Sequence, residues 1–305
     1  MSHILPDGSQ NEASSRPGQA ALWMLGAIAS FSTMAVSGRN LYEDHDTFEI
    51  MLFRSIIGIG IVLFVARLAG TLHEVRTRHF RTHLVRNIFH FSGQNLWFFA
   101  VAVAPLAQVI ALEFTSPLWV TLLAPLFLSE RLTRIRACAA LIGFIGVIIV
   151  AQPDLANLDP GLLAALAAAL CFAVTAIFTK LLTRTDGTTG ILFWLTVIQA
   201  VFGLVAVFWD GRVAFPTAET LPWLLAVAVA GLTAHFCLTT ALRLAPAMIV
   251  MPMDFLRLPA LALIGLVAYN EPLTLLIVFG SALILCGNFL NLWTENRKKT
   301  QTKAL

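Results

Sequence analysis

Charged residues are scarce in this chain. Asp, Glu, Lys and Arg make up 12% of its 305 residues, about half of the roughly 25% that is typical of a soluble domain. Hydrophobic residues make up 58%, and the mean hydropathy is +0.81. A soluble surface needs more charge than this, so the composition excludes a soluble globular domain and indicates a protein embedded in a membrane.

Cysteine is also rare, and motifs for catalysis or nucleotide hydrolysis are missing. The four cysteines lie inside apolar runs, without a C-x-x-C partner or a histidine at metal-ligand spacing: Cys138, Cys171, Cys237 and Cys286. This pattern favours small apolar packing residues. The sequence contains no G-x-x-x-x-G-K-[ST], no H-E-x-x-H and no G-x-S-x-G, which disfavours an ATP-driven pump and a zinc protease. We therefore expect no enzyme, no cofactor, no metal ion and no nucleic-acid partner.

Long apolar stretches are abundant. A helix that crosses the bilayer needs roughly 20 mostly apolar residues. Ten stretches meet this requirement, at 20–38, 47–66, 86–104, 107–128, 135–151, 161–179, 190–209, 221–242, 247–269 and 273–293. The predicted fold class is an all-α integral membrane protein with ten transmembrane helices.

The distribution of Lys and Arg supports ten spans. With the N-terminus inside, sixteen of the twenty basic residues fall in inner segments, and only Arg39 and Arg212 in outer ones. This asymmetry is a strong positive-inside signal. Residues 1–19 predict a disordered cytoplasmic tail rather than a signal peptide, because no basic segment precedes a short apolar core. Residues 294–305 predict a basic cytoplasmic tail.

One inner segment is unusually long and basic. Residues 67–87 read RLAGTLHEVRTRHFRTHLVRN, and we expect them on the cytoplasmic membrane surface, against anionic lipid. Three histidines in this segment, His73, His79 and His83, are expected to be solvated.

The sequence matches itself at one fixed displacement along the chain, which we call the repeat offset. At the repeat offset Glu113 corresponds to Asp254, and the Ala-Pro pair at 104–105 corresponds to the pair at 245–246. The chain therefore divides into two repeats, 20–151 and 161–293, with five spans each. Because five is odd, the second repeat must enter the membrane with the opposite orientation. Inverted repeats are a recurrent design of secondary transporters.

The repeats carry a family resemblance. The stretch FFAVAVAPLAQVIALEFTSPLWVTLLAPLFLSERL, then GFIGVIIV, and the second-copy stretches TTALRLAPAMIV, YNEPL and CGNFL resemble the EamA family of the drug/metabolite transporter superfamily. The resemblance covers the chain from Ala20 to about Trp293. It implies a ten-helix solute carrier of the cell inner membrane with both termini cytoplasmic. It leaves the substrate open among amino acids, nucleotide-like metabolites, vitamins and toxic amphiphiles.

Polar residues inside the spans are the candidate substrate-binding residues, because a charge near mid-membrane costs roughly 2.5–3.5 kcal/mol on insertion scales. Arg54 and Glu113 are expected at similar depth, as an ion pair that either joins two helices or lines a cavity. Asp254 and Arg257 are three residues apart on one helix, which allows a local pair. The remaining candidates are His90, Gln94, Trp97, His235 and Trp194, with structural roles as the alternative.

Two prolines are candidate gating residues. Pro117 cannot donate a hydrogen bond to the carbonyl of Glu113, so a helix bend is expected there. In the second repeat the break is displaced by one residue, to Pro259. Broken helices in membranes are tolerated where they line a cavity or are buried in protein, so both bends are expected at a transport cavity.

These features predict a secondary transporter of a small organic metabolite that works by alternating access, coupled to protons or to exchange. The family subgroup favours a vitamin or nucleotide-like solute. The alternatives are an exporter of amino acids or drug-like amphiphiles and an uncoupled facilitator. The expected partners are the small-molecule substrate and the lipid bilayer, and a homodimer is left open.

Overall fold

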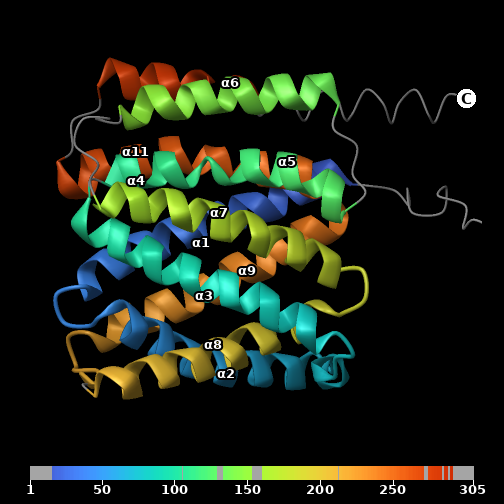
Figure 1. The fold of residues 1–305 in the computed structure, drawn as a ribbon. Coiled ribbons are helices and arrows are strands. Elements are labelled where there is room, and N and C mark those ends of the chain that lie inside the picture. Colours follow the sequence, from blue (N-terminus) through green and yellow to red (C-terminus); the bar gives the residue numbers. More distant parts are fainter. Residues whose placement is uncertain are drawn as a thin grey trace, which may run out of the picture.

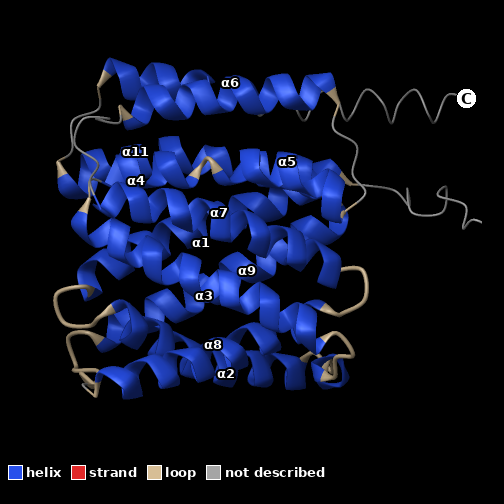
Figure 2. Cartoon of the chain, viewed as in Figure 1, coloured by secondary structure: helices blue, strands red, loops and turns tan. Residues whose placement is uncertain are grey.

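The computed structural model describes residues 16–104, 106–128, 133–152, 160–211, 213–270, 274–283, 285–287 and 289–290. Within these ranges every regular element is a helix (Figures 1 and 2). The helices lie side by side in one bundle, with α2 and α8 at one edge and α6 at the other (Figure 1). The predicted tail at 294–305 and most of the one at 1–19 lie outside the described residues, although α1 already begins at Pro17.

Seven of the described helices are long and continuous. They are α1 (Pro17–Leu41), α2 (Thr47–Leu68), α3 (Phe80–Val103), α6 (Arg134–Ala151), α7 (Pro160–Leu182), α8 (Thr188–Asp210) and α9 (Leu221–Leu244). A short 3-10 helix, η1 (Leu72–Val75), connects α2 to α3. The local sequence determines where α2 starts, because Asp46 and Glu49 form a reciprocal capping box there.

The outer faces of the helices are apolar. Leu126, Phe208 and Val267 have exposed fractions of 77%, 74% and 75%, which suits contact with lipid and would be costly in water. By length and composition, six helical stretches can cross a membrane: Pro17–Leu41, Thr47–Leu68, Pro160–Leu182, Thr188–Trp209, Leu221–Leu244 and Ile249–Ala268. The chain is therefore a multi-pass membrane protein, and the full set of ten spans stays a prediction.

Two of the predicted spans are broken. The first consists of α4 (Leu106–Glu113) and α5 (Ser116–Phe127), and the second of α10 (Ala247–Met253), the 3-10 turn η2 (Asp254–Leu256) and α11 (Arg257–Tyr269). The breaks begin at Glu113 and Asp254, which correspond to each other at the repeat offset.

The two halves pack reciprocally. Helix α1 packs along α9, and α7, the equivalent of α1, packs along α3, the equivalent of α9; α2 packs along its own equivalent, α8. Such exchanged contacts are expected when two similar halves are related by an approximate two-fold axis.

The loop between α7 and α8 is held by a cluster that we call the Asp186 clasp. The carboxylate of Asp186 accepts hydrogen bonds from four side chains, at 2.6–3.1 Å: Thr77, Thr185, His79 and His83. Arg243 at the end of α9 donates to the backbone oxygen of Asp186, at 2.6 Å. The clasp joins α3 and the segment before it, the α7–α8 loop and α9. The prediction that His83 is solvated is wrong, because its ring is fully buried against Asp186.

The clasp changes the acidity of its carboxyl group. Burial raises the pKa of Asp186, but the hydrogen bonds that the carboxylate accepts outweigh burial and lower this pKa to about 2. Because the pKa in the folded protein lies below that of an unfolded Asp, about 3.9, the clasp stabilises the fold above about pH 4. This contribution is lost as the pH falls toward 2.

We expect Asp186→Asn to lower the thermal unfolding temperature of the purified protein at pH 7 by about 2–5 °C. The reason is that a neutral amide replaces an acceptor-only carboxylate among several donors. The difference between this variant and the unsubstituted protein should shrink between about pH 4 and pH 2. Glu219→Gln, at an exposed loop residue, is the matched control, and a difference that stays constant from pH 6 to pH 2 would contradict the assignment.

Candidate transport cavity

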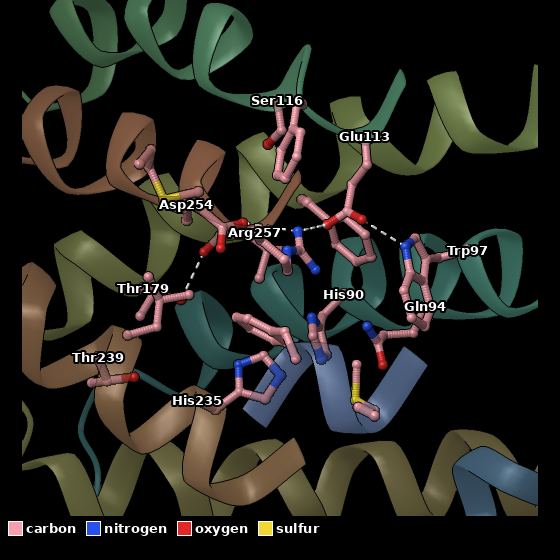
Figure 3. Close-up of a pocket in the computed structure, with 18 of the residues that line it drawn as sticks. His90, Gln94, Trp97, Glu113, Ser116, Thr179, His235, Thr239, Asp254 and Arg257 are labelled. Carbon is pink, nitrogen blue, oxygen red and sulfur yellow. Dashed lines mark hydrogen bonds and ion pairs between the residues drawn. The ribbon is translucent and has the colours of Figure 1, made fainter. Parts of the chain in front are cut away.

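A cavity lies where the two broken helices meet α1, α3, α7 and α9 (Figure 3). About 700 Å³ of its space is free of protein atoms, part of it open to solvent. Seven of the nine predicted substrate-binding residues line it: His90, Gln94, Trp97, Glu113, His235, Asp254 and Arg257. The structure thus brings together residues from five different helical segments.

The centre of the cavity is an ionic cluster of Glu113, Arg257 and Asp254. One guanidinium nitrogen of Arg257, Nη2, donates to Oε1 of Glu113 and, at 2.8 Å, to Oδ2 of Asp254. All three residues are at least nine-tenths buried. The pair between Asp254 and Arg257 was expected from their spacing. The pair between Arg257 and Glu113 joins residues 144 positions apart and bridges the two helix breaks.

Aromatic rings surround this cluster. The guanidinium carbon of Arg257 lies 5.1 Å from the ring centroid of Phe31 and 5.2 Å from that of Phe114, within cation–π range. The indole Nε1 of Trp97 donates to Oε2 of Glu113, at 2.7 Å. The charges are therefore held in fixed positions between planar apolar surfaces.

Two histidines meet beside the cluster. The rings of His90 and His235 have centroids 4.7 Å apart in an edge-to-face arrangement, and they lie below the charged residues in Figure 3. Both are buried, and neither ring nitrogen of His90 has a hydrogen-bond partner among the described residues. Both histidines therefore face the same cavity, and their role in substrate binding stays a prediction.

Arg54 has a different partner from the one expected. It donates to Oε1 of Gln94 instead of pairing with Glu113, and it borders a second, smaller pocket. The sequence predicts how deep Arg54 and Glu113 lie in the membrane, but not how each helix is rotated about its axis. It therefore could not distinguish a contact of Arg54 with Gln94 from one with Glu113. Gln94 therefore connects Arg54 to the main cavity.

The lining of the cavity has internal symmetry. Six pairs of lining positions correspond at the repeat offset: Phe31 and Phe172, Met34 and Thr175, Gln94 and His235, Trp97 and Leu238, Glu113 and Asp254, and Ser116 and Arg257. Both repeats therefore contribute corresponding positions to the cavity, and the chemistry differs within most pairs.

Sequence reasoning missed Arg86. The sequence places Arg86 in the basic inner segment, but in the structure it lies within α3, which begins at Phe80. Its side chain lines the cavity, and the residue is only 1% exposed. Its Nε donates to Oγ1 of Thr179, at 2.6 Å. A usable signal was present, because Arg86 lies four residues before His90 and therefore on the same face of a helix.

The remaining predicted residues lie elsewhere or at the breaks. Trp194 is away from the cavity: its Nε1 donates to the carbonyl of Val75, at 2.9 Å, and its ring packs on Phe80. Pro117 lies in the first turn of α5 and Pro259 in the first turn of α11. Both prolines are therefore beside a helix break, as their missing N–H groups predict.

Apolar outer faces around a buried cavity with charged and aromatic groups define a membrane transport protein. The sequence model of the EamA-like transporter family matches residues 18–152 and again 159–293. The chain belongs to this family, which confirms the resemblance seen in its repeats. Among the described residues, no group of His, Cys, Asp and Glu side chains is placed to hold a metal ion.

Curated relatives are named transporters. The chain is 28% identical to a riboflavin transporter of Vibrio cholerae, over 93% of this chain and 97% of the relative. It is 30% identical to a riboflavin transporter of Brucella anthropi, over 83% and 90%, and 24% identical to an S-adenosylmethionine uptake transporter of Rickettsia bellii, over 93% and 96%. A crystal structure with 20% identity and a TM-score of 0.72, covering 92% of this chain and 98% of its own, shares the fold.

We expect Arg257→Gln to destabilise the protein by about 3–5 kcal/mol, because it leaves two carboxylates buried without their cation. Glu113→Gln should cost less, since Arg257 keeps Asp254 as a partner. Thermal unfolding of the purified variants in detergent measures this order, with Arg67→Gln, at an exposed arginine near the end of α2, as the control. An Arg257→Gln variant as stable as the Arg67→Gln control would show that the ionic cluster does not support the fold.

Proposed function

We propose that this protein is a secondary transporter that moves a planar heterocyclic metabolite, of the flavin or nucleoside-like kind, by alternating access. The observation that carries the proposal is the ionic cluster at the two helix breaks. Buried charges are costly in a membrane and by default indicate a solute pathway. Non-helical backbone at such breaks is tolerated inside a membrane where it lines a cavity.

The cavity suits a planar solute with a polar edge. Phe31, Phe114, Phe172 and Trp97 line the cavity with aromatic rings, which suits contact with a flat heterocycle. The buried oxygen Oδ1 of Asp254 and the Nε of Arg257 have no hydrogen-bond partner among the described residues, so an acceptor and a donor lie close together. The names of the relatives support riboflavin as the first solute to test and S-adenosylmethionine as the second.

The repeat architecture supports alternating access. The reciprocal packing of α1 with α9 and of α3 with α7 is what two inverted halves need in order to exchange conformations. In this proposal ten spans hold the N- and C-termini in the cytoplasm, and the cavity opens alternately to either side. Energy comes from a proton gradient or from exchange of one solute for another.

Transport in reconstituted vesicles tests the proposal. Vesicles that contain the protein should accumulate labelled riboflavin or S-adenosylmethionine faster than empty vesicles, and Glu113→Gln should lower the rate about tenfold or more, because it removes one charge of the cluster. Accumulation driven by a pH gradient indicates proton coupling, and dependence on solute preloaded inside indicates exchange. Absence of flux for both compounds would refute the proposed substrate class.

The helix break beside Pro117 can be tested for a role as a gate. If the break between α4 and α5 works as a gate, Pro117→Ala should lower the maximal transport rate several-fold without reducing membrane insertion, because a regular helix can then form across Glu113. Pro125→Ala, inside α5 and away from the break, is the matched control. Equal rates for the two variants would mean that the proline only supports packing.

A further inference from the structure

Arg86 is a buried cation for which the described residues provide no counterion. Its residue is 1% exposed, and its one hydrogen bond to a described residue goes to the hydroxyl of Thr179. No carboxylate among the described residues forms an ion pair with it, whereas Arg257 in the same cavity has two. Its Nη1 is buried and has no hydrogen-bond partner in the part of the chain that the structure describes. An unpaired buried charge costs several kcal/mol, so the fold by itself gives no reason to keep it.

The other repeat shows that packing does not need a cation at this position. At the repeat offset, Arg86 corresponds to Val227, which is fully buried. Helix α9, the equivalent of α3, therefore packs with an apolar side chain at this position. Arg86 breaks the symmetry of the cavity, which points to a role on one side of a bound molecule.

The surroundings of Arg86 also contain unused hydrogen-bonding groups. Both ring nitrogens of His90 and the Nε2 of His235 are buried and have no hydrogen-bond partner within the described ranges. These two residues line the same cavity as Arg86. His90 lies one helical turn from Arg86 on α3. Together the charged guanidinium of Arg86 and the two imidazole rings form a region with unused hydrogen-bonding groups, made of residues other than the ionic cluster of Glu113, Arg257 and Asp254.

We propose that Arg86 binds an oxygen acceptor of the substrate, either a carboxylate or the carbonyl of an imide-type ring, with His90 and His235 beside it. The proposal rests on the proposed transport function and assigns the polarity of the site: the acceptor-rich end of the solute lies at Arg86. Arginine suits this role because its planar guanidinium offers several donors in a fixed geometry. Hydrogen bonds to a charged group are also the stronger kind.

Ligand-induced stabilisation of the purified protein in detergent tests the assignment. Three probes are compared: riboflavin, S-adenosylmethionine and orotate, a planar imide that also carries a carboxylate. A probe that binds should raise the unfolding temperature of the unsubstituted protein and of Arg67→Gln, the exposed control. Arg86→Gln should abolish this rise, and Arg86→Lys should retain part of it because the charge remains.

Two further measurements separate binding from a structural role. Without any probe, Arg86→Gln should unfold at the same temperature as the unsubstituted protein or higher, because it removes an unpaired buried charge. In vesicles its KM for the transported probe should rise about tenfold or more, with a smaller change in kcat. A lower unfolding temperature without probe, or an unchanged KM, would overturn the assignment of Arg86.

The outcomes also distinguish this assignment from the proposed function. Stabilisation by orotate alone, lost in Arg86→Gln, would support Arg86 as the acceptor-binding residue while refuting a flavin or S-adenosylmethionine substrate. If no probe stabilises the unsubstituted protein, both proposals fail. If riboflavin or S-adenosylmethionine stabilises Arg86→Gln as much as the unsubstituted protein, only the Arg86 assignment fails.

Discussion

The ionic bridge from Arg257 to Glu113 and Asp254 is the interaction on which the centre of this protein depends. It joins two helix breaks that belong to different halves of the chain. Each carboxylate would be costly in an apolar bundle without a cation. Arg257 donates a hydrogen bond to each of the two carboxylates, so the two breaks can lie next to each other beside the cavity.

Symmetry and its violation explain how this cavity becomes selective. Equivalent positions of the two repeats line it, in keeping with the reciprocal packing of α1 with α9 and of α3 with α7. A symmetric lining would bind both ends of a solute alike. At the repeat offset, Gln94 corresponds to His235, Ser116 to Arg257 and Arg86 to the buried Val227. These differences make the two sides of the cavity chemically different. Solute recognition is therefore expected to depend on positions where the repeats have diverged.

The end of the bundle at the α7–α8 loop is held by a different kind of interaction. The Asp186 clasp relies on one carboxylate with several donors near the surface, where water still competes, whereas the central cluster relies on mutual neutralisation in an apolar interior. A carrier needs stable interactions at its core and weaker ones at its ends, because local opening draws on the less stable parts of a structure.

Much of the fold could be read from the sequence. The apolar stretches predict the helices, because hydropathy is a property of each segment alone, and Pro117 and Pro259 indicate the breaks because a missing N–H acts locally. The repeat offset predicts which positions are equivalent. Only the tertiary structure decided that Glu113 pairs with Arg257 instead of Arg54, that Arg86 enters the cavity, that His83 is buried and that Trp194 is not in the site. These outcomes depend on the rotation of each helix about its axis, and that rotation is set by packing between segments that lie far apart in the sequence.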